Sequence, residues 1–411
     1  MERLSARPYK LFNKIQNYDW GTTNDEAFIP NFLGTDPKPN VPYAELWIGA
    51  HPKAPSEIEV NGKLIPLNII LEEHPVEYLG NYAAKKFNKK FPFLLKILSA
   101  ARALSIQTHP DKEQAKKLHA ADPKNYPDDN HKPEIAIAVD SLTAIAGFRP
   151  AEEIVENLRS LPELKEYAGE SEYEKIFNSV GKSEKEKSIK ELYAVIMKKS
   201  DETERLNNCV EGIRQRFLAK ENLSLEESQF LTQYKLFGSD VGLLSFFFFN
   251  FVQLKPHQAI FTKAGVPHAY IKGNIIECMA NSDNVVRAGL TNKFKDVNTL
   301  LEIMRYDFEK YEIINSEAKS SEVKYKTPAE EFEVSYFKKD TGLDEKINSN
   351  DKPAVYLIYN GSLKVSWEYG EKKMSQKFSK GESFLVPASL AQYEIYSEEG
   401  MSFYKVEVPV P

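Results

Sequence analysis

Residues 104–112, LSIQTHPDK, combine a strand-like pattern with side chains that are unfavourable to bury. Ser105, Gln107 and His109 are spaced two apart, so on a strand their side chains project to the same face. Polar groups on a buried face need partners, because an unpaired polar group loses its hydration without compensation. A metal ion on that face would supply the partner for the imidazole and the amide oxygen.

A second segment with chemical potential is YPDDNHKPEIAIAVD, residues 126–140. Lys132 and Glu134 share one strand face, whereas His131 alternates with them and points the other way. Glu134 stands at the head of the apolar run IAIAV, which places a carboxylate at the edge of a buried strand. A charge at a strand start is also common without any function.

A third segment is GVPHAYIKGNIIECMA, which contains the dipeptide Gly273-Asn274 between two apolar stretches. Such a dipeptide predicts a two-residue turn of a β-hairpin. Regular pairing across that turn places His268, Tyr270 and Glu277 on one face of the sheet. That face could hold a functional site, or it could be an ordinary solvated surface.

Together these segments offer a four-ligand metal site composed of Gln107, His109, Glu134 and His268. Two imidazoles, a carboxylate and an amide oxygen suit zinc, and also manganese or iron. Glutamine is an unusual ligand, so its inclusion makes the hypothesis specific.

Composition limits the classes of protein that need to be considered. The 411 residues include 54 Lys+Arg and 60 Asp+Glu, for a net charge of −6, which argues against nucleic acid as the main partner. Cys209 and Cys278 form no CxxC motif, which fits a reducing compartment. The start MERLSARPYKLF lacks the apolar core of a signal peptide, and the apolar run 243–254 is too short to span a bilayer. We therefore expect a soluble, cytoplasmic protein with no membrane partner, and read 243–254 as a buried strand.

The chain length suggests two or three domains, and the patterns divide it into β, α and β parts. Residues 1 to about 150 are β-rich, with an Asn61-Gly62 hairpin and a short helix after Pro110. Helical spacing dominates from about 152 to 240, where Ser224 and Glu227 form a plausible capping box. Strand patterns then return, interrupted by one helix near 297–304, and a second Asn-Gly hairpin is expected at Asn360.

A short similarity between two segments of the chain suggests a repeated β domain. FTKAGVPHAY and ESFLVPASLAQY share a hydrophobic-Val-Pro arrangement, but no histidine follows His268. If the repeat is real, its second copy has no counterpart of the first copy's metal site.

The segments LSIQTHPDK, YPDDNHKPEIAIAV and GVPHAYIKGNIIECMANSDNVVRAGLTNKFKDV resemble the hallmark segments of type I mannose-6-phosphate isomerase (phosphomannose isomerase). NYDWG and AELWIGAHPKAPS are similar to that family as well, and all five occur in the family's order within residues 17–300. The resemblance implies a mainly β fold of the cupin superfamily, with two cupin-like β-barrel (jelly-roll) domains and an inserted α-helical domain. The implied boundaries are 1–151 with 241–330 for the catalytic cupin domain, 152–240 for the helical domain and 331–411 for a metal-free cupin-like domain.

The resemblance also implies the reaction and its cofactor. One zinc ion per chain would be held by residues matching Gln107, His109, Glu134 and His268. The enzyme would interconvert mannose 6-phosphate and fructose 6-phosphate through an enediol, and so supply mannose metabolism and GDP-mannose synthesis. Its partner would be a small phosphorylated sugar, and the protein is expected to be a monomer.

Several residues are candidates for the chemistry itself. The reaction needs a base that moves a proton between C2 and C1, and both Glu277 and Lys132 are candidates for it. Arg287 matches an arginine that the family assigns to the active site, where a guanidinium can stabilise enediolate charge or bind phosphate. His131 is a candidate for ring opening. Ser105 and Lys293 complete the candidates and are expected to bind the phosphate, although Lys293 could be an ordinary surface lysine.

Two other functions compete with isomerisation. A cupin metal dioxygenase would normally use iron and three histidines, and neither Gln107 nor the NHKPE run fits that pattern. A cupin sugar-binding or storage module would not need Lys132, Glu277 and Arg287 together. An assay on mannose 6-phosphate would distinguish the three.

Overall fold

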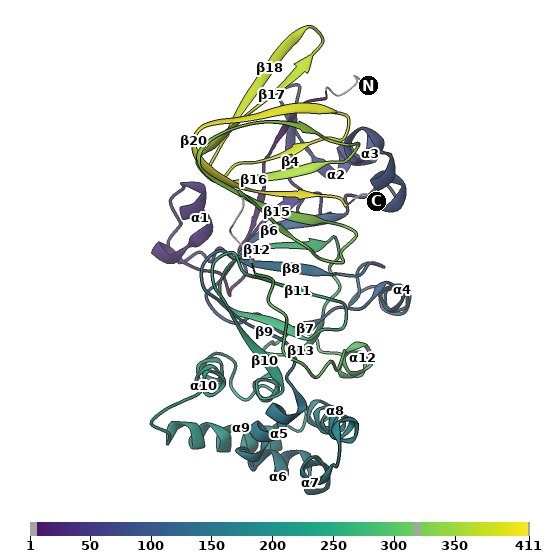
Figure 1. The fold of residues 1–411 in the computed structure, drawn as a ribbon. Helices are drawn as coiled ribbons and strands as arrows, with labels where there is room; N and C mark the ends of the chain where they lie inside the picture. The colour runs from purple at the N-terminus through teal and green to yellow at the C-terminus, as the bar shows by residue number, and fades with distance from the viewer. Residues whose placement is uncertain (1–5, 316–320, 410–411) are drawn as a thin grey trace.

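The computed structural model describes residues 6–315 and 321–409, which form two large sheets and a group of helices. In Figure 1 the sheet built mainly from the C-terminal residues lies at the top, a ten-stranded sheet lies in the middle, and helices α5 to α10 lie at the bottom. The predicted mixture of sheets and helices is therefore confirmed.

The ten-stranded sheet carries the candidate residues. Its main path is β10-β9-β12-β6-β3-β2, and β7, β8, β11 and β13 pair alongside it. The strands are β2 (Lys14–Gln16), β3 (Glu45–Gly49), β6 (Phe93–Ala100), β7 (Ile106–Thr108), β8 (Glu134–Ala138), β9 (Leu142–Phe148), β10 (Phe249–Leu254), β11 (Ala259–Thr262), β12 (His268–Ala280) and β13 (Val286–Gly289). Every residue of β6 and β8 is buried, which agrees with their continuous apolar sequences.

The hairpin expected at Gly273-Asn274 is wrong, because β12 is one strand of 13 residues. It pairs with β6, β7, β8 and β9, and its register on β9 shifts between Tyr270 and Lys272. Gly273 has a φ of +135°, and a Cβ there would lie 2.6 Å from the carbonyl oxygen of Ser141. The glycine thus permits close approach of a neighbouring segment, and the strand bends here without reversing.

The eight-stranded sheet contains most of the C-terminal residues and also the first strand of the chain. Its strands are β1 (Tyr9–Leu11), β14 (Glu322–Tyr325), β15 (Glu333–Asn348), β16 (Ala354–Asn360), β17 (Ser362–Tyr369), β18 (Lys372–Ser379), β19 (Ser383–Val386) and β20 (Gln392–Glu407). The hairpin expected at Asn360 is also wrong. Among the described residues β16 and β17 do not pair with each other, and each pairs with β20 instead. Gly361 instead packs against Gly400, whose carbonyl oxygen would lie 2.7 Å from an added Cβ.

The Asn61-Gly62 hairpin is confirmed by a small two-stranded sheet. It consists of β4 (Glu57–Val60) and β5 (Lys63–Pro66), and both turn residues have positive φ. The path of each large sheet runs between two different end strands, so neither closes into a barrel over the described residues. The jelly-roll assignment and the domain boundaries stay predictions.

Helices occupy the region that the periodicity indicated. Those between the two β parts are α5 (Ala151–Arg159), α6 (Glu163–Ala168), α7 (Glu170–Asn178), α8 (Lys182–Lys198), α9 (Thr203–Leu218) and α10 (Leu225–Phe237). The capping box of α10 is confirmed: Ser224 Oγ accepts from the Glu227 amide, and the Glu227 carboxylate accepts from the Ser224 amide. No helix among the described residues is both long and apolar enough to cross a membrane.

The remaining helices are short and lie among the strands. They are η1 (Asn24–Glu26), α1 (Phe28–Leu33), α2 (Leu67–Glu73), α3 (Pro75–Lys86), α4 (Lys112–Ala121), α11 (Gly242–Ser245) and α12 (Val297–Ile303). The helix expected after Pro110 is α4, capped by Asp111. The strand expected over 243–254 is only partly correct, because α11 precedes β10 and the aromatic run between them packs into the core of the helices. A continuous apolar run does not distinguish buried strand from buried helix.

Candidate active site

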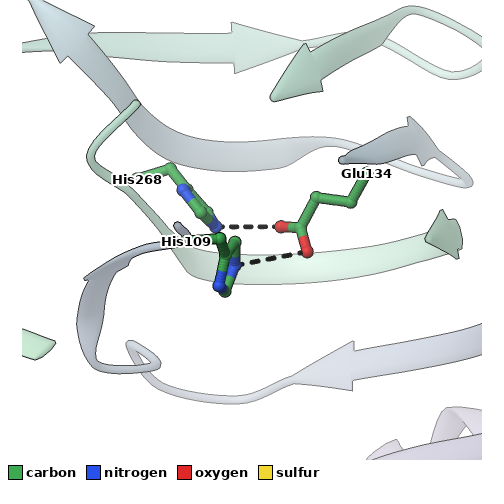
Figure 2. A group of neighbouring side chains, drawn as sticks. All are labelled: His109, Glu134 and His268. Carbon is green, nitrogen blue, oxygen red and sulfur yellow. Dashed lines mark ion pairs between the residues drawn. The ribbon is translucent and has the colours of Figure 1, made fainter. Parts of the chain in front are cut away.

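Three strands place a buried His-Glu-His group at one point of the ten-stranded sheet (Figure 2). His109 follows β7, Glu134 begins β8 and His268 begins β12, and each is at most 1% exposed. One ligand-type atom of each residue lies within 4.8 Å of the other two. His268 Nε2 is 2.8 Å from Glu134 Oε1, and His109 Nε2 is 3.6 Å from Glu134 Oε2. Three of the four residues predicted as ligands are therefore together.

The hydrogen bonds of the two imidazoles orient one nitrogen of each ring toward the carboxylate. His109 Nδ1 donates to the carbonyl oxygen of Asn284 at 2.6 Å, and His268 Nδ1 donates to that of Val266 at 2.9 Å. Burial, aided by the charge of Lys132, lowers the pKa of His109 to about 4, so its ring is neutral at pH 7. The lone pair of His109 Nε2 thus faces a carboxylate oxygen.

The donor atoms of this group fit a divalent metal ion. His109 Nε2, His268 Nε2 and Glu134 Oε2 are buried and have no hydrogen-bond partner in the described structure. Buried polar atoms are rarely left without partners, and two lone pairs that face each other repel unless a cation lies between them. Histidine ligands whose other nitrogen donates to a backbone carbonyl are the usual arrangement at zinc sites.

Gln107 is placed next to this group by strand pairing. In β7 it lies opposite His268 of β12 on one side and opposite Arg287 of β13 on the other. Cross-strand partners share a face of the sheet, so the Gln107 amide belongs to the surface that carries the triad. Its part as a fourth ligand stays a prediction.

A layer of buried charges surrounds the triad. Lys132 Nζ is 3.2 Å from Glu134 Oε2. Lys96 of β6 bridges two acids, at 3.0 Å from Glu277 Oε2 and 3.5 Å from Glu45 Oε2. All of these side chains are less than a tenth exposed, so the charges are balanced by one another and not by water.

The same layer drives the pKa values of two carboxyl groups apart. Burial works to raise the pKa of Glu134, but Lys132 and the two histidines lower it well below its usual range. For Glu277 burial dominates, and the pKa is raised even though Lys96 opposes the change. Neighbouring carboxyl groups whose pKa values are shifted in opposite directions are typical of acid–base sites.

Tyr270 connects the two carboxyl groups of this layer. Its hydroxyl donates to Glu134 Oε1 at 3.1 Å, and burial followed by the charges of Glu134 and Glu277 raises its pKa well above the ordinary value. The sequence placed Tyr270, His268 and Glu277 on one face. The structure brings them to one site through a bent strand with a register shift and not through the expected hairpin.

A pocket of about 380 Å³ opens beside the buried layer. Its lining contains five of the residues predicted from the sequence: Ser105, Gln107, Lys132, Arg287 and Lys293. Three aromatic residues, Tyr18, Trp20 and Trp47, form part of the wall, and Leu236 and Phe237 at the end of α10 contribute apolar surface. The pocket has the size and polarity for a small polar ligand.

His131 lies apart from this pocket. Its Nε2 is 2.7 Å from Glu331 Oε1, Glu331 is buried, and His131 is not among the described lining residues. Strand alternation had placed His131 on the face opposite Lys132, but β8 begins only at Glu134, so the contact with Glu331 does not test that reasoning. The structure does not bring His131 to the triad.

Sequence reasoning missed Lys96, Glu45 and Trp47, which line the pocket as well. The Trp47 indole N–H donates to the Glu45 carboxylate, which fixes the acid next to Lys96. A signal for Lys96 was present, because it is the one charge in the apolar run FLLKILSA. Its acidic partners come from other strands and could not be assigned from spacing.

Comparison with known proteins decides the family. The chain is 35% identical over 388 residues to the mannose-6-phosphate isomerase of Schizosaccharomyces pombe, an alignment that covers 88% of this chain and 91% of that protein. The chain belongs to the type I mannose-6-phosphate isomerase family. Residues 9–151 also match the model of the phosphomannose isomerase type I catalytic domain. The predicted enzyme class, an aldose–ketose isomerase acting on mannose 6-phosphate, is confirmed with the family.

Solved structures of mannose-6-phosphate isomerases share this fold over nearly the whole chain. A variant of phosphomannose isomerase from Salmonella typhimurium superposes with a TM-score of 0.85 at 26% identity, covering 98% of this chain and 100% of that one. A mannose 6-phosphate isomerase bound with zinc and yttrium gives a TM-score of 0.83 at 26% identity, with the same coverage.

Proposed function

We propose that the protein is a zinc-dependent isomerase that interconverts mannose 6-phosphate and fructose 6-phosphate through an enediol. The observation that carries the metal part is the cluster of three buried ligand atoms on His109, Glu134 and His268 that have no hydrogen-bond partner in the described structure. A structurally similar isomerase bound with zinc and yttrium supports the choice of zinc. We assign one ion per chain, with Gln107 as the fourth protein ligand. When bound, zinc would supply a redox-silent Lewis acid that polarises the sugar oxygens at C1 and C2.

The proton transfer falls to a residue of the buried layer. The base must remove the proton from C2 and return it to C1 of the enediol, and its pKa should lie near neutrality. Glu277 is our first choice because burial raises its pKa, and Lys132 is the alternative because it lines the pocket beside Glu134. Both assignments are open to direct test.

The cationic residues of the pocket fit the charges of substrate and intermediate. Arg287 belongs to β13 beside Gln107, where a guanidinium can stabilise the negative oxygen of an enediolate. Ser105 and Lys293 are proposed to bind the phosphate, since both line the same pocket. Ring opening by His131 has no such support, because its described contact is with Glu331.

The wider predictions belong to the same proposal. Isomerisation of mannose 6-phosphate would supply mannose metabolism and GDP-mannose synthesis. The cupin jelly-roll assignment for both β parts, a monomeric state and a cytoplasmic location follow from the family resemblance and the composition, and each awaits its own test.

A coupled assay on purified protein tests the proposal against its two competitors. We expect fructose 6-phosphate to form from mannose 6-phosphate without consumption of dioxygen, to stop after chelation and to return when zinc is added. Dioxygen uptake would favour the dioxygenase, and sugar binding without turnover would favour the binding module. Full activity in metal-free protein would contradict the zinc assignment.

A further inference from the structure

Asn284 lies outside the pocket lining and holds His109, one of the proposed metal ligands, through its backbone carbonyl. Asn284 is fully buried in the segment just before β13. Its carbonyl oxygen accepts the hydrogen bond of His109 Nδ1 at 2.6 Å. The position of this carbonyl therefore sets both the tautomer and the ring orientation of His109.

The side chain of Asn284 fixes that carbonyl in place. Its Nδ2 is 2.7 Å from the Asp128 carbonyl oxygen, 3.2 Å from Asp128 Oδ1 and 2.9 Å from the Asn130 carbonyl oxygen. Three acceptors around a single amide nitrogen leave only one orientation for the amide group. Its backbone N–H donates in turn to Ser282 Oγ at 3.2 Å.

Asp128 strengthens the same connection from the other side. Its Oδ1 accepts from Ser282 Oγ and its Oδ2 from the Asp283 amide, each at 2.7 Å. The segment 128–130 leads directly into Lys132 and Glu134, so the segment that contacts His109 is bonded to the one that supplies the carboxylate ligand. One buried asparagine thereby links the segment of His109, just after β7, to the segment that leads into Glu134 at the start of β8.

We propose that Asn284 is a positioning residue of the metal centre. Its backbone carbonyl binds His109, and its side-chain amide binds the segment 128–130 that precedes Glu134, so that it fixes the position of His109 relative to Glu134. This inference rests on the proposed metal site. The role is distinct from ligation and from contact with the sugar, because Asn284 acts through His109 and is not among the described lining residues of the pocket.

The test compares Asn284→Ala with Asn281→Ala. Asn281 is three residues earlier in the same segment, is half-buried, and its amide makes only a 3.4 Å bond to the Phe91 carbonyl oxygen. Zinc dissociation constants are measured by chelator competition, and the d–d absorption of cobalt-loaded protein reports ligand geometry. We expect Asn284→Ala to weaken zinc binding about 10–100-fold and to change the cobalt spectrum. The zinc dissociation constant of Asn281→Ala should stay within about twofold of the wild-type value, well below the change expected for Asn284→Ala.

The outcomes separate this inference from the proposal that it rests on. A wild-type protein that does not bind zinc refutes the metal site itself. A wild type that binds zinc, with Asn284→Ala equal to it in affinity and spectrum, overturns the positioning role, and so does an equal loss in Asn281→Ala. If Asn284→Ala does not fold, Ser282→Ala decides, because it removes only a hydroxyl that accepts from the Asn284 N–H and contacts Asp128 Oδ1 and the Asn130 carbonyl oxygen. A weakening of about threefold or more then supports the role, and unchanged affinity overturns it.

Discussion

Replacing Lys96 with methionine should destabilise the protein strongly, although the new side chain is similar in length. Lys96 is the cation between Glu277 and Glu45, and all three side chains are at most 7% exposed. Burial works to lower the pKa of Lys96, but Glu277 and Glu45 raise it above its ordinary value, so the lysine is charged. The substitution leaves two buried carboxylates without their shared partner.

The magnitude follows from the two contact distances. At 3.0 and 3.5 Å, with an effective dielectric constant of about 20, each contact contributes about 5 kcal/mol of gross attraction. Desolvation offsets much of this, so the net loss on removing one partner of a buried pair is about 3–5 kcal/mol. Adding Glu45→Gln to Lys96→Met should recover part of that loss, because one uncompensated charge is then removed.

Urea unfolding followed by circular dichroism measures this cost, with the exposed pocket residue Lys293→Met as the control. The activity profile adds a second readout, because losing the Lys96 charge should raise the pKa of Glu277 further. If Glu277 is the base, the acid limb of kcat/KM moves to higher pH in Lys96→Met. A stability loss below about 1 kcal/mol would refute the reasoning about the buried charges. An unmoved acid limb would refute Glu277 as the base.

Three further predictions concern the pocket and the triad. Arg287→Ala should lower kcat/KM about a hundredfold through loss of a transition-state charge partner, with little change in the free energy of unfolding; equal losses of stability and activity would contradict this role. Glu277→Gln should abolish exchange of the substrate's C2 proton with solvent, whereas exchange that survives there and stops in Lys132→Met would make Lys132 the base. Metal-free protein should lose about 3 kcal/mol of stability as pH falls from about 6.5 to about 4. The pKa of His109 is about 4 in the folded protein and about 6.5 in the unfolded chain, so the unfolded chain binds the proton first as the pH falls. Urea unfolding between pH 7.5 and 4.5 checks this, and His109→Gln should flatten the dependence; a slope unchanged in that variant would count against it.

Local chemistry made some elements of the fold predictable from the sequence. The capping box of α10 follows from residue types at fixed offsets, and the helix after Pro110 was expected as well, although Asp111 proves to be its N-cap and not part of its first turn. The turn at Asn61-Gly62 is likewise a local property. The same rule failed at Gly273 and Gly361, where distant segments approach the glycine and the chain does not reverse. A glycine next to an asparagine indicates an unusual backbone conformation, but tertiary contacts decide whether the chain reverses there or continues past a neighbouring segment.

The candidate site was predictable to the extent that alternation on strands groups its residues. The strand spacing that includes His109 and the Glu134 charge at a strand start pointed to two members of the His-Glu-His group, while the part of Gln107 as a ligand stays a prediction. The partners of Lys96 were not predictable, because Glu45 and Glu277 come from strands β3 and β12 that lie on either side of β6. Asn284 could not be found either, since its importance lies in a backbone carbonyl, which the sequence does not distinguish.

The most direct test of a metal centre at His109, Glu134 and His268 is the metal content of purified protein. Mass spectrometry of metals should find one zinc ion per chain in the wild type and a large loss of zinc in His268→Ala. His257→Ala is the matched control, because His257 is half-buried, stacks on Tyr336 and lies outside the triad; it should keep the full complement of zinc. A wild type without zinc, or a His268→Ala variant that retains as much zinc as His257→Ala, would contradict the assignment of the metal to this triad.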